Sequence, residues 1–322
     1  MRAPRNRRWL LVQIVIAAIV IGSIGYALVK QWREFRGTPL TTDLHWEFVL
    51  LSGAVVLLTY GVLIETWRRM LAAWGKHLAF GDAVRITCIS KLGIYVPGRI
   101  WQVSTMAVMA QQAGISSGAA AASAVVSTAV NIAVGMAIAL IAGWRAVDIM
   151  SGGHANVGVV LVVIALAGLL ALPKLAPPAI AWIQRKTGRE PGAAAFPRRA
   201  VYIAVAGNVV AWVLYGIAFQ LFVRGILGKA PGTTSAYVAA YSASYVIGYL
   251  MFVIPGGLGV REGALILAMP ALGLATDKQA AVIAVTSRLW LTVLEIVPGL
   301  YFWARRTPPP SKETTPRNGS KQ

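Results

Sequence analysis

The stretch SSGAAAASAVVSTAVNIAVGMAIALIAGW, which runs from Ser116 to Trp144, contains no Asp, Glu, Lys or Arg. A transmembrane helix needs about 20 consecutive apolar residues to span about 30 Å of hydrocarbon, and this stretch exceeds that length. The rest of the chain has the same character, because 57% of its 322 residues are hydrophobic and only 13% are charged. Soluble domains typically have about 25% charged residues. The sequence therefore predicts an all-α, polytopic helical membrane protein.

Seven further apolar stretches are interpreted as membrane spans. They are Trp9–Val29, Trp46–Trp67, Asn156–Leu172, Arg199–Val223, Thr234–Ile254, Gly257–Ala275 and Lys278–Trp303. The first is longer than the apolar core of about 7–15 residues in a signal peptide, so we expect it to be retained. We interpret Gly81–Gly114 as a re-entrant hairpin and let Gly257–Ala275 cross, which predicts about eight crossings. Residues 1–306 then form one integral membrane domain, and the Pro-rich residues 307–322 form a disordered cytoplasmic tail.

Positive charge dominates the chain, with 30 Lys and Arg against 11 Asp and Glu and a formal net charge of +19. These basic residues lie mostly between and beside the apolar stretches, which favours anionic lipid over nucleic acid as the partner. Cytoplasmic loops carry the excess of Lys and Arg in membrane proteins. That rule predicts that both termini lie in the cytoplasm.

Several classes of chemistry lack support in the sequence. The single cysteine, Cys88, excludes a disulfide framework, and the three histidines are too far apart to predict a metal site. Gly114–Gly118 fits G-x-S-x-G, but it lies between two helical stretches rather than at a strand–helix turn. Gly257–Glu262 begins like G-x-G-x-x-G but ends in Glu and follows no strand. No Walker A or H-E-x-x-H sequence occurs. We expect no metal, no cofactor and no enzymatic activity.

Charged residues inside the apolar stretches form the candidate substrate site. A charge in hydrocarbon costs at least a few kcal/mol and marks a functional position, and two Pro-Gly breaks lie beside such charges. Helix breaks also expose backbone N–H groups that bind anions. The predicted substrate-binding residues are Lys91, Tyr95, Pro97, Arg99, Pro255, Gly257, Gly259, Arg261, Glu262, Arg288 and Glu295.

Within this set, Arg99, Arg261 and Arg288 are predicted to contact an anionic headgroup, for which the guanidinium fork is suited. Glu262 and Glu295 would hold or release the arginines. The alternative is internal neutralisation, in which Arg288 and Arg261 pair with the two glutamates only to hold helices together. The excess of basic over acidic groups at membrane depth favours an anion from outside the protein.

Polar and small residues also recur at i, i+4 spacing, which places them on one helix face. Three stripes result: Ser123, Ser127, Asn131 and Gly135; Asn208, Trp212, Gly216 and Gln220; and Tyr237, Tyr241, Tyr245 and Tyr249. Close helix packing explains the serine–glycine stripe, whereas the tyrosines predict either packing or a path for a polar headgroup.

A weak internal repeat connects the two breaks. Ser90-Lys-Leu-Gly-Ile-Tyr-Val-Pro-Gly-Arg99 in one half corresponds to Ser244, Gly248 and Val253-Ile-Pro-Gly-Gly257 in the other. Paired Gly/Pro-interrupted apolar segments in the two halves point to a transporter binding site. Coincidence is the alternative, because Pro-Gly also occurs at 191, 231 and 298.

Two motifs resemble the signature regions of the lysylphosphatidylglycerol synthase transmembrane (flippase-like) family. They are Ser90-Lys-Leu-Gly93 with Val96-Pro-Gly-Arg99, and Ile254-Pro-Gly-Gly-Leu-Gly-Val-Arg-Glu-Gly263. The resemblance implies a membrane domain of the bacterial cytoplasmic (inner) membrane that moves aminoacylated phosphatidylglycerol between leaflets, with relatives linked to polyprenyl- or glycolipid pathways. Full-length synthases of this kind add a soluble domain that transfers lysine from tRNA. No such domain is expected here.

The resulting hypothesis is transbilayer transport of an anionic or aminoacylated phospholipid, or of a polyprenyl-linked lipid or glycolipid. One alternative is an intramembrane lipid-modifying enzyme that uses Glu262 or Glu295 as a general acid or base. Another is an accessory subunit that recruits a glycosyltransferase through the basic linker Lys174–Arg199. A membrane-bound or soluble synthase partner and the oligomeric state are left open by the sequence.

Overall fold

The computed structural model describes residues 44–73, 75–95, 100–150, 198–251, 257 and 259–305, together with scattered positions between 160 and 182. The elements are α2 (Trp46–Ala73), α3 (Phe80–Lys91), the 3-10 helix η1 (Leu92–Tyr95), α4 (Ile100–Gln112), α5 (Ser117–Met150), α7 (Arg198–Leu227), α8 (Thr234–Leu250), α9 (Val260–Ala271) and α10 (Asp277–Ala304). All of them are helices, which confirms the all-α prediction. The predicted first helix, most of Asn156–Leu172 and the predicted tail lie outside the described residues.

Four long helices have the length and composition of membrane spans. The spans are Trp46–Ala73, Ala122–Trp144, Arg198–Leu227 and Asp277–Ala304, within α2, α5, α7 and α10. At 1.5 Å per residue, even the shortest of them reaches about 35 Å, which exceeds the hydrocarbon core. They agree with four of the stretches predicted from hydropathy alone.

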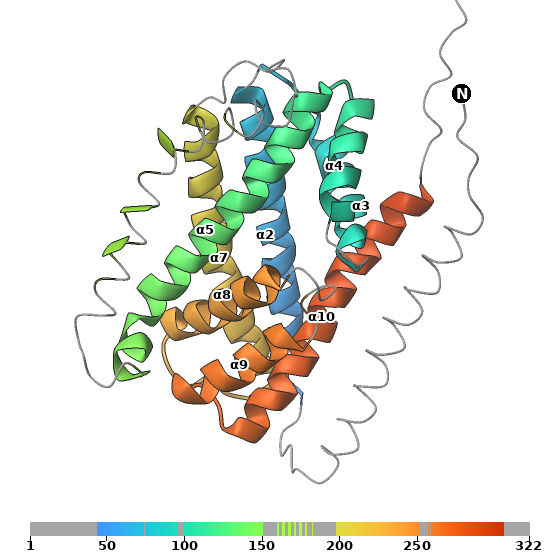
Figure 1. The fold of residues 1–322 in the computed structure, drawn as a ribbon. Coiled ribbons are helices and arrows are strands. Elements are labelled where there is room, and N and C mark those ends of the chain that lie inside the picture. Colours follow the sequence, from blue (N-terminus) through green and yellow to red (C-terminus); the bar gives the residue numbers. More distant parts are fainter. Residues whose placement is uncertain are drawn as a thin grey trace, which may run out of the picture.

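The long helices α2 and α7 pack against each other in opposite directions. The backbone N–H of His45, just before α2, donates to the carbonyl oxygen of Gly225 near the end of α7 at 3.0 Å. At the other end of the pair, Gly207 near the start of α7 lies directly against the side chain of Thr66. Figure 1 shows the same antiparallel arrangement. Glycine permits this approach because it has no Cβ.

Between α2 and α5 the chain forms a hairpin of two short helices, α3 and α4. Its base is closed by Leu78 and Ile115, which belong to one buried cluster. At its tip, a Cβ on Gly93 would lie 2.8 Å from the backbone nitrogen of Gln102, so α3 and α4 converge there. The predicted re-entrant hairpin Gly81–Gly114 corresponds to this helical pair.

A second hairpin, α8 with α9, lies between α7 and α10. At its base, a Cβ on Gly232 would lie 2.6 Å from Leu274 Cδ2, and at its tip a Cβ on Gly248 would lie 2.8 Å from Arg261 Cβ. The two predicted spans Thr234–Ile254 and Gly257–Ala275 correspond to the two arms of this hairpin. Its helix α9 has 12 residues, or about 18 Å, and it folds back along α8 to the end from which α8 started.

The two hairpins reveal an inverted repeat. Each half has the order long, short, short, long: α2–α3–α4–α5 and then α7–α8–α9–α10. The last helix of each half packs on the first short helix of the other half: α5 packs on α8, and α10 packs on α3. Since α2 and α7 are antiparallel, the hairpins lie at opposite ends of the molecule (Figure 1). The structure therefore supports an internal duplication, and not coincidence, as the origin of the repeat seen in the sequence. The two copies have the inverted topology that is common among transporters.

Replacing Gly257 with Ala should destabilise the α8–α9 hairpin. Gly257 has φ of +67°, and a Cβ there would lie 2.5 Å from the carbonyl oxygen of Gly248. The left-handed conformation alone costs about 1–2 kcal/mol with a side chain. We expect a lower melting temperature of the purified protein in detergent. The matched control is Gly263→Ala in α9, where no atom lies within 4 Å of the added Cβ; a control as unstable as Gly257→Ala would contradict this explanation.

Candidate functional site

A cavity of about 140 Å³ with several polar groups in its wall lies where the two halves meet. Helices α2, α3, α4 and α5 of the first half line it together with α7 and α8 of the second. Its neutral polar groups include Thr87, Gln102, Ser127, Asn131 and Asn208. Apolar side chains such as Leu63, Trp67 and Met106 make up the rest of the wall, so the cavity combines groups that can bind water or a polar headgroup with an apolar surface.

The first short helix of each hairpin ends at this cavity. Lys91 is the last residue of α3 and Tyr249 is the penultimate residue of α8, and both line the cavity. The two breaks that the sequence singled out therefore follow helix ends that converge on one space. Tyr95 ends η1, whereas Pro97, Arg99 and Pro255 lie outside the described residues.

Lys91 is held by an aromatic ring and a carboxylate from different parts of the chain. Its ammonium nitrogen lies 3.2 Å from the centroid of the Tyr60 ring and 3.7 Å from Glu295 Oε1. The Tyr60 hydroxyl donates to the same Glu295 oxygen at 3.4 Å. Lys91 and Glu295 are only 18% and 17% exposed. This contact therefore links the first half to α10 of the second half away from bulk solvent.

Glu262 connects the start of α9 to α10. One carboxylate oxygen accepts a hydrogen bond from the backbone N–H of Gly259 at 2.6 Å, which caps α9 at a glycine with φ of +81°. The other oxygen lies 3.7 Å from Arg288 Nε. The motif Gly259-Val-Arg-Glu262 thus positions an acid that stabilises a helix start and faces a buried cation.

Arg261, which is 5% exposed, lies among aromatic rings. Its guanidinium carbon is 5.1 Å from the centroid of the Tyr241 ring and 5.2 Å from that of Tyr245. Both distances fall in the range of cation–π contacts. Gly248 allows α9 to approach α8 closely enough for this contact.

Internal neutralisation accounts for part of the buried charge. The described ion pairs among the predicted residues are Lys91–Glu295 and Arg288–Glu262. Among those predicted residues that the structure describes, three cations therefore stand against two carboxylates, with Arg261 on tyrosine faces. Both interpretations of the buried charge are therefore met in part. The two ion pairs join helices, as internal neutralisation predicts, and these described residues keep one positive charge in excess, as binding of an external anion requires.

The predicted stripes serve both packing and the cavity. Asn131 Nδ2 donates to Asn208 Oδ1 at 2.7 Å, and Trp212 Nε1 donates to the Asn131 carbonyl oxygen at 3.1 Å. These bonds join α5 to α7 at the cavity wall. In the tyrosine stripe, Tyr245 and Tyr249 line the cavity, whereas Tyr237 and Tyr241 are buried in the core.

Sequence reasoning missed Tyr60, Thr87 and Gln102 as site residues. None of them belongs to a charged motif or to a stripe, and only the packing of α2, α3 and α4 brings them to the cavity. The internal repeat held a signal for Gln102, because the two hairpin tips are built alike. Gln102 lies against Gly93 at the first tip, and Arg261 lies against Gly248 at the second.

Replacing Glu295 with Gln should destabilise the protein, because Lys91 loses its carboxylate in a poorly hydrated place. Breaking one side of a buried ion pair costs up to about 3–5 kcal/mol. Adding Lys91→Met to Glu295→Gln should recover much of the loss in melting temperature measured in detergent. Glu65→Gln is the control, because its pairs with Arg68 and Arg69 are more exposed and worth about 1 kcal/mol or less. A double variant as unstable as Glu295→Gln would show that the pair is not coupled.

Comparison with known protein families identifies the membrane region. The chain matches the family described as "Lysylphosphatidylglycerol synthase TM region" over residues 10–299. Comparison with curated proteins gives no match. The family match covers all the described helices up to residue 299, including both hairpins and the cavity. The chain therefore belongs to the lysylphosphatidylglycerol synthase transmembrane family and is an integral, multi-pass membrane protein.

Proposed function

We propose that this protein moves a lipid with an anionic headgroup across the bilayer. The observation that carries the proposal is the polar cavity of about 140 Å³ between two inverted halves. A headgroup in this cavity would be shielded from hydrocarbon while its acyl chains stay among the lipid tails.

The size of the cavity supports a headgroup as the cargo. A site for one water needs only about 10–15 Å³ of such space, so a cavity of about 140 Å³ has room for several water molecules. That space suits a headgroup such as a phosphate with a short substituent. The wall offers hydroxyl and amide groups from Thr87, Ser127 and Asn131, which can replace the water that a headgroup loses.

The charge of the site supports an anion. Lys91 lines the cavity, and Arg261 lies on the ring of Tyr245, which also lines it. An anionic headgroup that entered would compensate the excess cation and compete with Glu295 for Lys91. Glu262 and Glu295 would hold the cations in the absence of lipid and release them when a headgroup binds. This is the role that the sequence analysis assigned to the two glutamates.

The proposal places the protein in a bacterial cytoplasmic membrane with a cytoplasmic N-terminus. Its partner would be an anionic lipid made by a separate synthase, and the protein would change the leaflet of that lipid without changing its chemical structure. Lipid mass therefore discriminates this function from an intramembrane enzyme, which would alter the mass.

Fluorescent phosphatidylglycerol in proteoliposomes of phosphatidylcholine and phosphatidylglycerol tests the proposal. We expect the purified protein to accelerate the appearance of the probe in the outer leaflet, where dithionite quenches it. Ser127→Trp, which fills the cavity, and Arg261→Ala, which removes a buried cation, should each slow the movement about tenfold or more, since a charge-assisted bond is worth about 1.5–3 kcal/mol. Arg68→Ala is the control, because Arg68 pairs with Glu65 outside the cavity.

Two results would contradict the proposal. If the probe moves no faster with wild-type protein than in protein-free vesicles, the protein does not move this class of lipid. If the rate of lipid movement is unchanged in Ser127→Trp, Arg261→Ala and Arg288→Ala, the lipid does not pass through this site.

A further inference from the structure

The two ion pairs at membrane depth differ in what their protons can do. Glu262 faces Arg288 and also accepts a hydrogen bond from the Gly259 N–H at 2.6 Å. Arginine keeps its proton in proteins, and the backbone donor at the start of α9 favours the ionised carboxylate, so Glu262 keeps its negative charge. Glu295 instead faces Lys91, and both members of that pair can exchange a proton with water.

Glu295 lies deep in its helix and next to the cavity. It is nine residues before the end of α10, or about 14 Å along the helix axis, and it is 17% exposed. Lys91 and Tyr60 both contact its carboxylate, and both line the cavity. The carboxylate is therefore one hydrogen bond away from a space with room for water.

The groups around Glu295 narrow the exchange of protons to one pair. Within the described part of the chain, the charged or titratable groups that interact with Glu295 include Lys91 of α3, Tyr60 of α2, Tyr215 of α7, Tyr241 and Tyr245 of α8, and Arg261 of α9. Arg288 lies seven residues earlier on α10 itself. Tyrosine is neutral below a pKa of about 10, and arginine stays charged. In this group, Lys91 and Glu295 are the residues that can change charge near neutral pH.

A lipid phosphate at Lys91 would bring a second anion to one ammonium group. Before it binds, Glu295 at 3.7 Å compensates the charge of Lys91. Once the phosphate takes this place, two anions share one cation in a poorly hydrated space, and two acids so placed do not both stay ionised. A phosphodiester is the stronger acid, so the proton goes to the carboxylate. The charge of Arg261, on the faces of Tyr241 and Tyr245, is the same before and after.

We propose that each anionic headgroup crosses together with one proton, which Glu295 takes up as the headgroup displaces it from Lys91. The proton comes from water on the side where the lipid enters and forms the O–H bond of the Glu295 carboxylic acid. It returns to water on the other side when the headgroup leaves and Glu295 pairs with Lys91 again. The inference rests on the proposed lipid movement, and it adds a source of energy for that movement, a proton gradient.

The balance of charge makes this cycle electroneutral. One negative headgroup and one proton enter and leave together, so the site has the same net charge with and without the lipid. No charge is added at membrane depth, where an uncompensated charge is costly. Lipid movement should therefore respond to a pH difference and not to the membrane potential. With one proton per lipid, each pH unit changes the distribution of the lipid between leaflets by a factor of about ten.

Proteoliposomes with a controlled pH difference test the coupling. A trace of fluorescent phosphatidylglycerol in phosphatidylcholine vesicles would be measured by a short dithionite pulse, which quenches the outer leaflet, while potassium and valinomycin hold the membrane potential at zero. We expect a lumen about one pH unit more acidic than the outside to shift the probe about tenfold toward the outer leaflet. Vesicles with the same pH on both sides, at either value, should show no shift. A potassium diffusion potential without a pH difference should also have no effect.

Replacing Glu295 with Gln should uncouple the movement, because an amide cannot take up the proton. The shift caused by the pH difference should fall from about tenfold to none. The comparison is made within each preparation below its melting temperature, so a smaller amount of folded protein does not alter it. Glu262→Gln removes a carboxylate at similar exposure and should keep the wild-type shift. Glu65→Gln, which breaks the pairs with Arg68 and Arg69, should keep it as well.

Proton uptake on lipid binding gives a measurement that does not require movement. Short-chain phosphatidylglycerol would be added to the purified protein in weakly buffered detergent with a pH-indicator dye. We expect wild-type protein to take up about one proton per bound lipid near neutral pH, and Glu295→Gln to take up none. Because the lipid-bound form carries the extra proton, binding should tighten as the pH falls, by up to about tenfold per pH unit.

The outcomes distinguish this inference from the proposed function. If wild-type protein moves the probe but its distribution ignores the pH difference, or follows the membrane potential, the coupling is wrong and lipid movement stands. If lipid binding takes up a proton through Glu295 but no lipid moves, the proton-linked site stands and the transport function fails. A Glu295→Gln variant that responds to the pH difference like wild type would overturn the inference, because another group would then carry the proton.

Discussion

The contact between Lys91 and Glu295 is the interaction on which the site depends. Their charged atoms lie 3.7 Å apart, with the ammonium also on the ring of Tyr60. Neither charge is stable alone in a hydrocarbon environment, so each constrains the position of the other. Because they belong to different halves of the chain, this constraint holds α3 against α10 and defines one wall of the polar cavity.

Close helix packing supplies the frame around this contact. Gly207 lies directly against Thr66, Gly53 faces Trp290, and Gly135 would place a Cβ 2.6 Å from Trp212. In a membrane, helices associate through van der Waals contact between small residues rather than through the hydrophobic effect. These glycines therefore set how closely the helices of the two halves approach each other.

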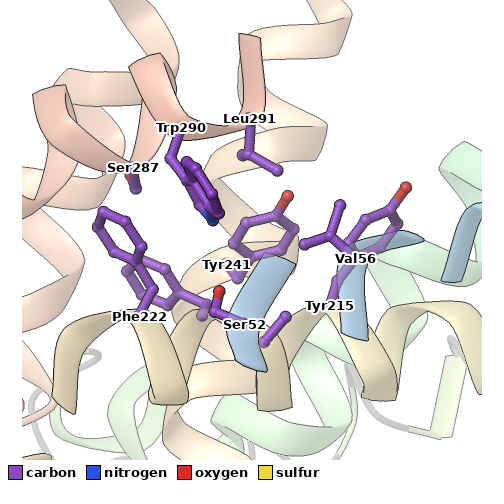
Figure 2. Close-up of a pocket in the computed structure, with 10 residues that line it drawn as sticks. Ser52, Val56, Tyr215, Phe222, Tyr241, Ser287, Trp290 and Leu291 are labelled. Atoms are coloured by element: carbon purple, nitrogen blue, oxygen red, sulfur yellow. The ribbon is translucent and has the colours of Figure 1, made fainter. Parts of the chain in front are cut away.

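The two halves share an order of helices but differ in the side chains at matching positions. Ser127 and Asn131 of α5 line the cavity of about 140 Å³, whereas Ser287 and Leu291, at the same positions of α10, line a space of about 10 Å³ together with Trp290 (Figure 2). The repeat is therefore preserved in the order and packing of the helices and not in the side chains of their walls. Arg261 lies beside both Tyr241, which lines the smaller space, and Tyr245, which lines the larger one.

The sequence by itself determined the apolar helices, the two breaks, the buried charges and the family resemblance. Each of these depends on local composition or on short motifs, since hydropathy and the cost of a charge in lipid are properties of a segment. Only the tertiary structure decided that Glu295 pairs with Lys91, that Glu262 pairs with Arg288, and that α9 folds back along α8. Those outcomes join distant residues, as Tyr60 joins Glu295 across 235 positions, and no local pattern carries the relative placement of two helices.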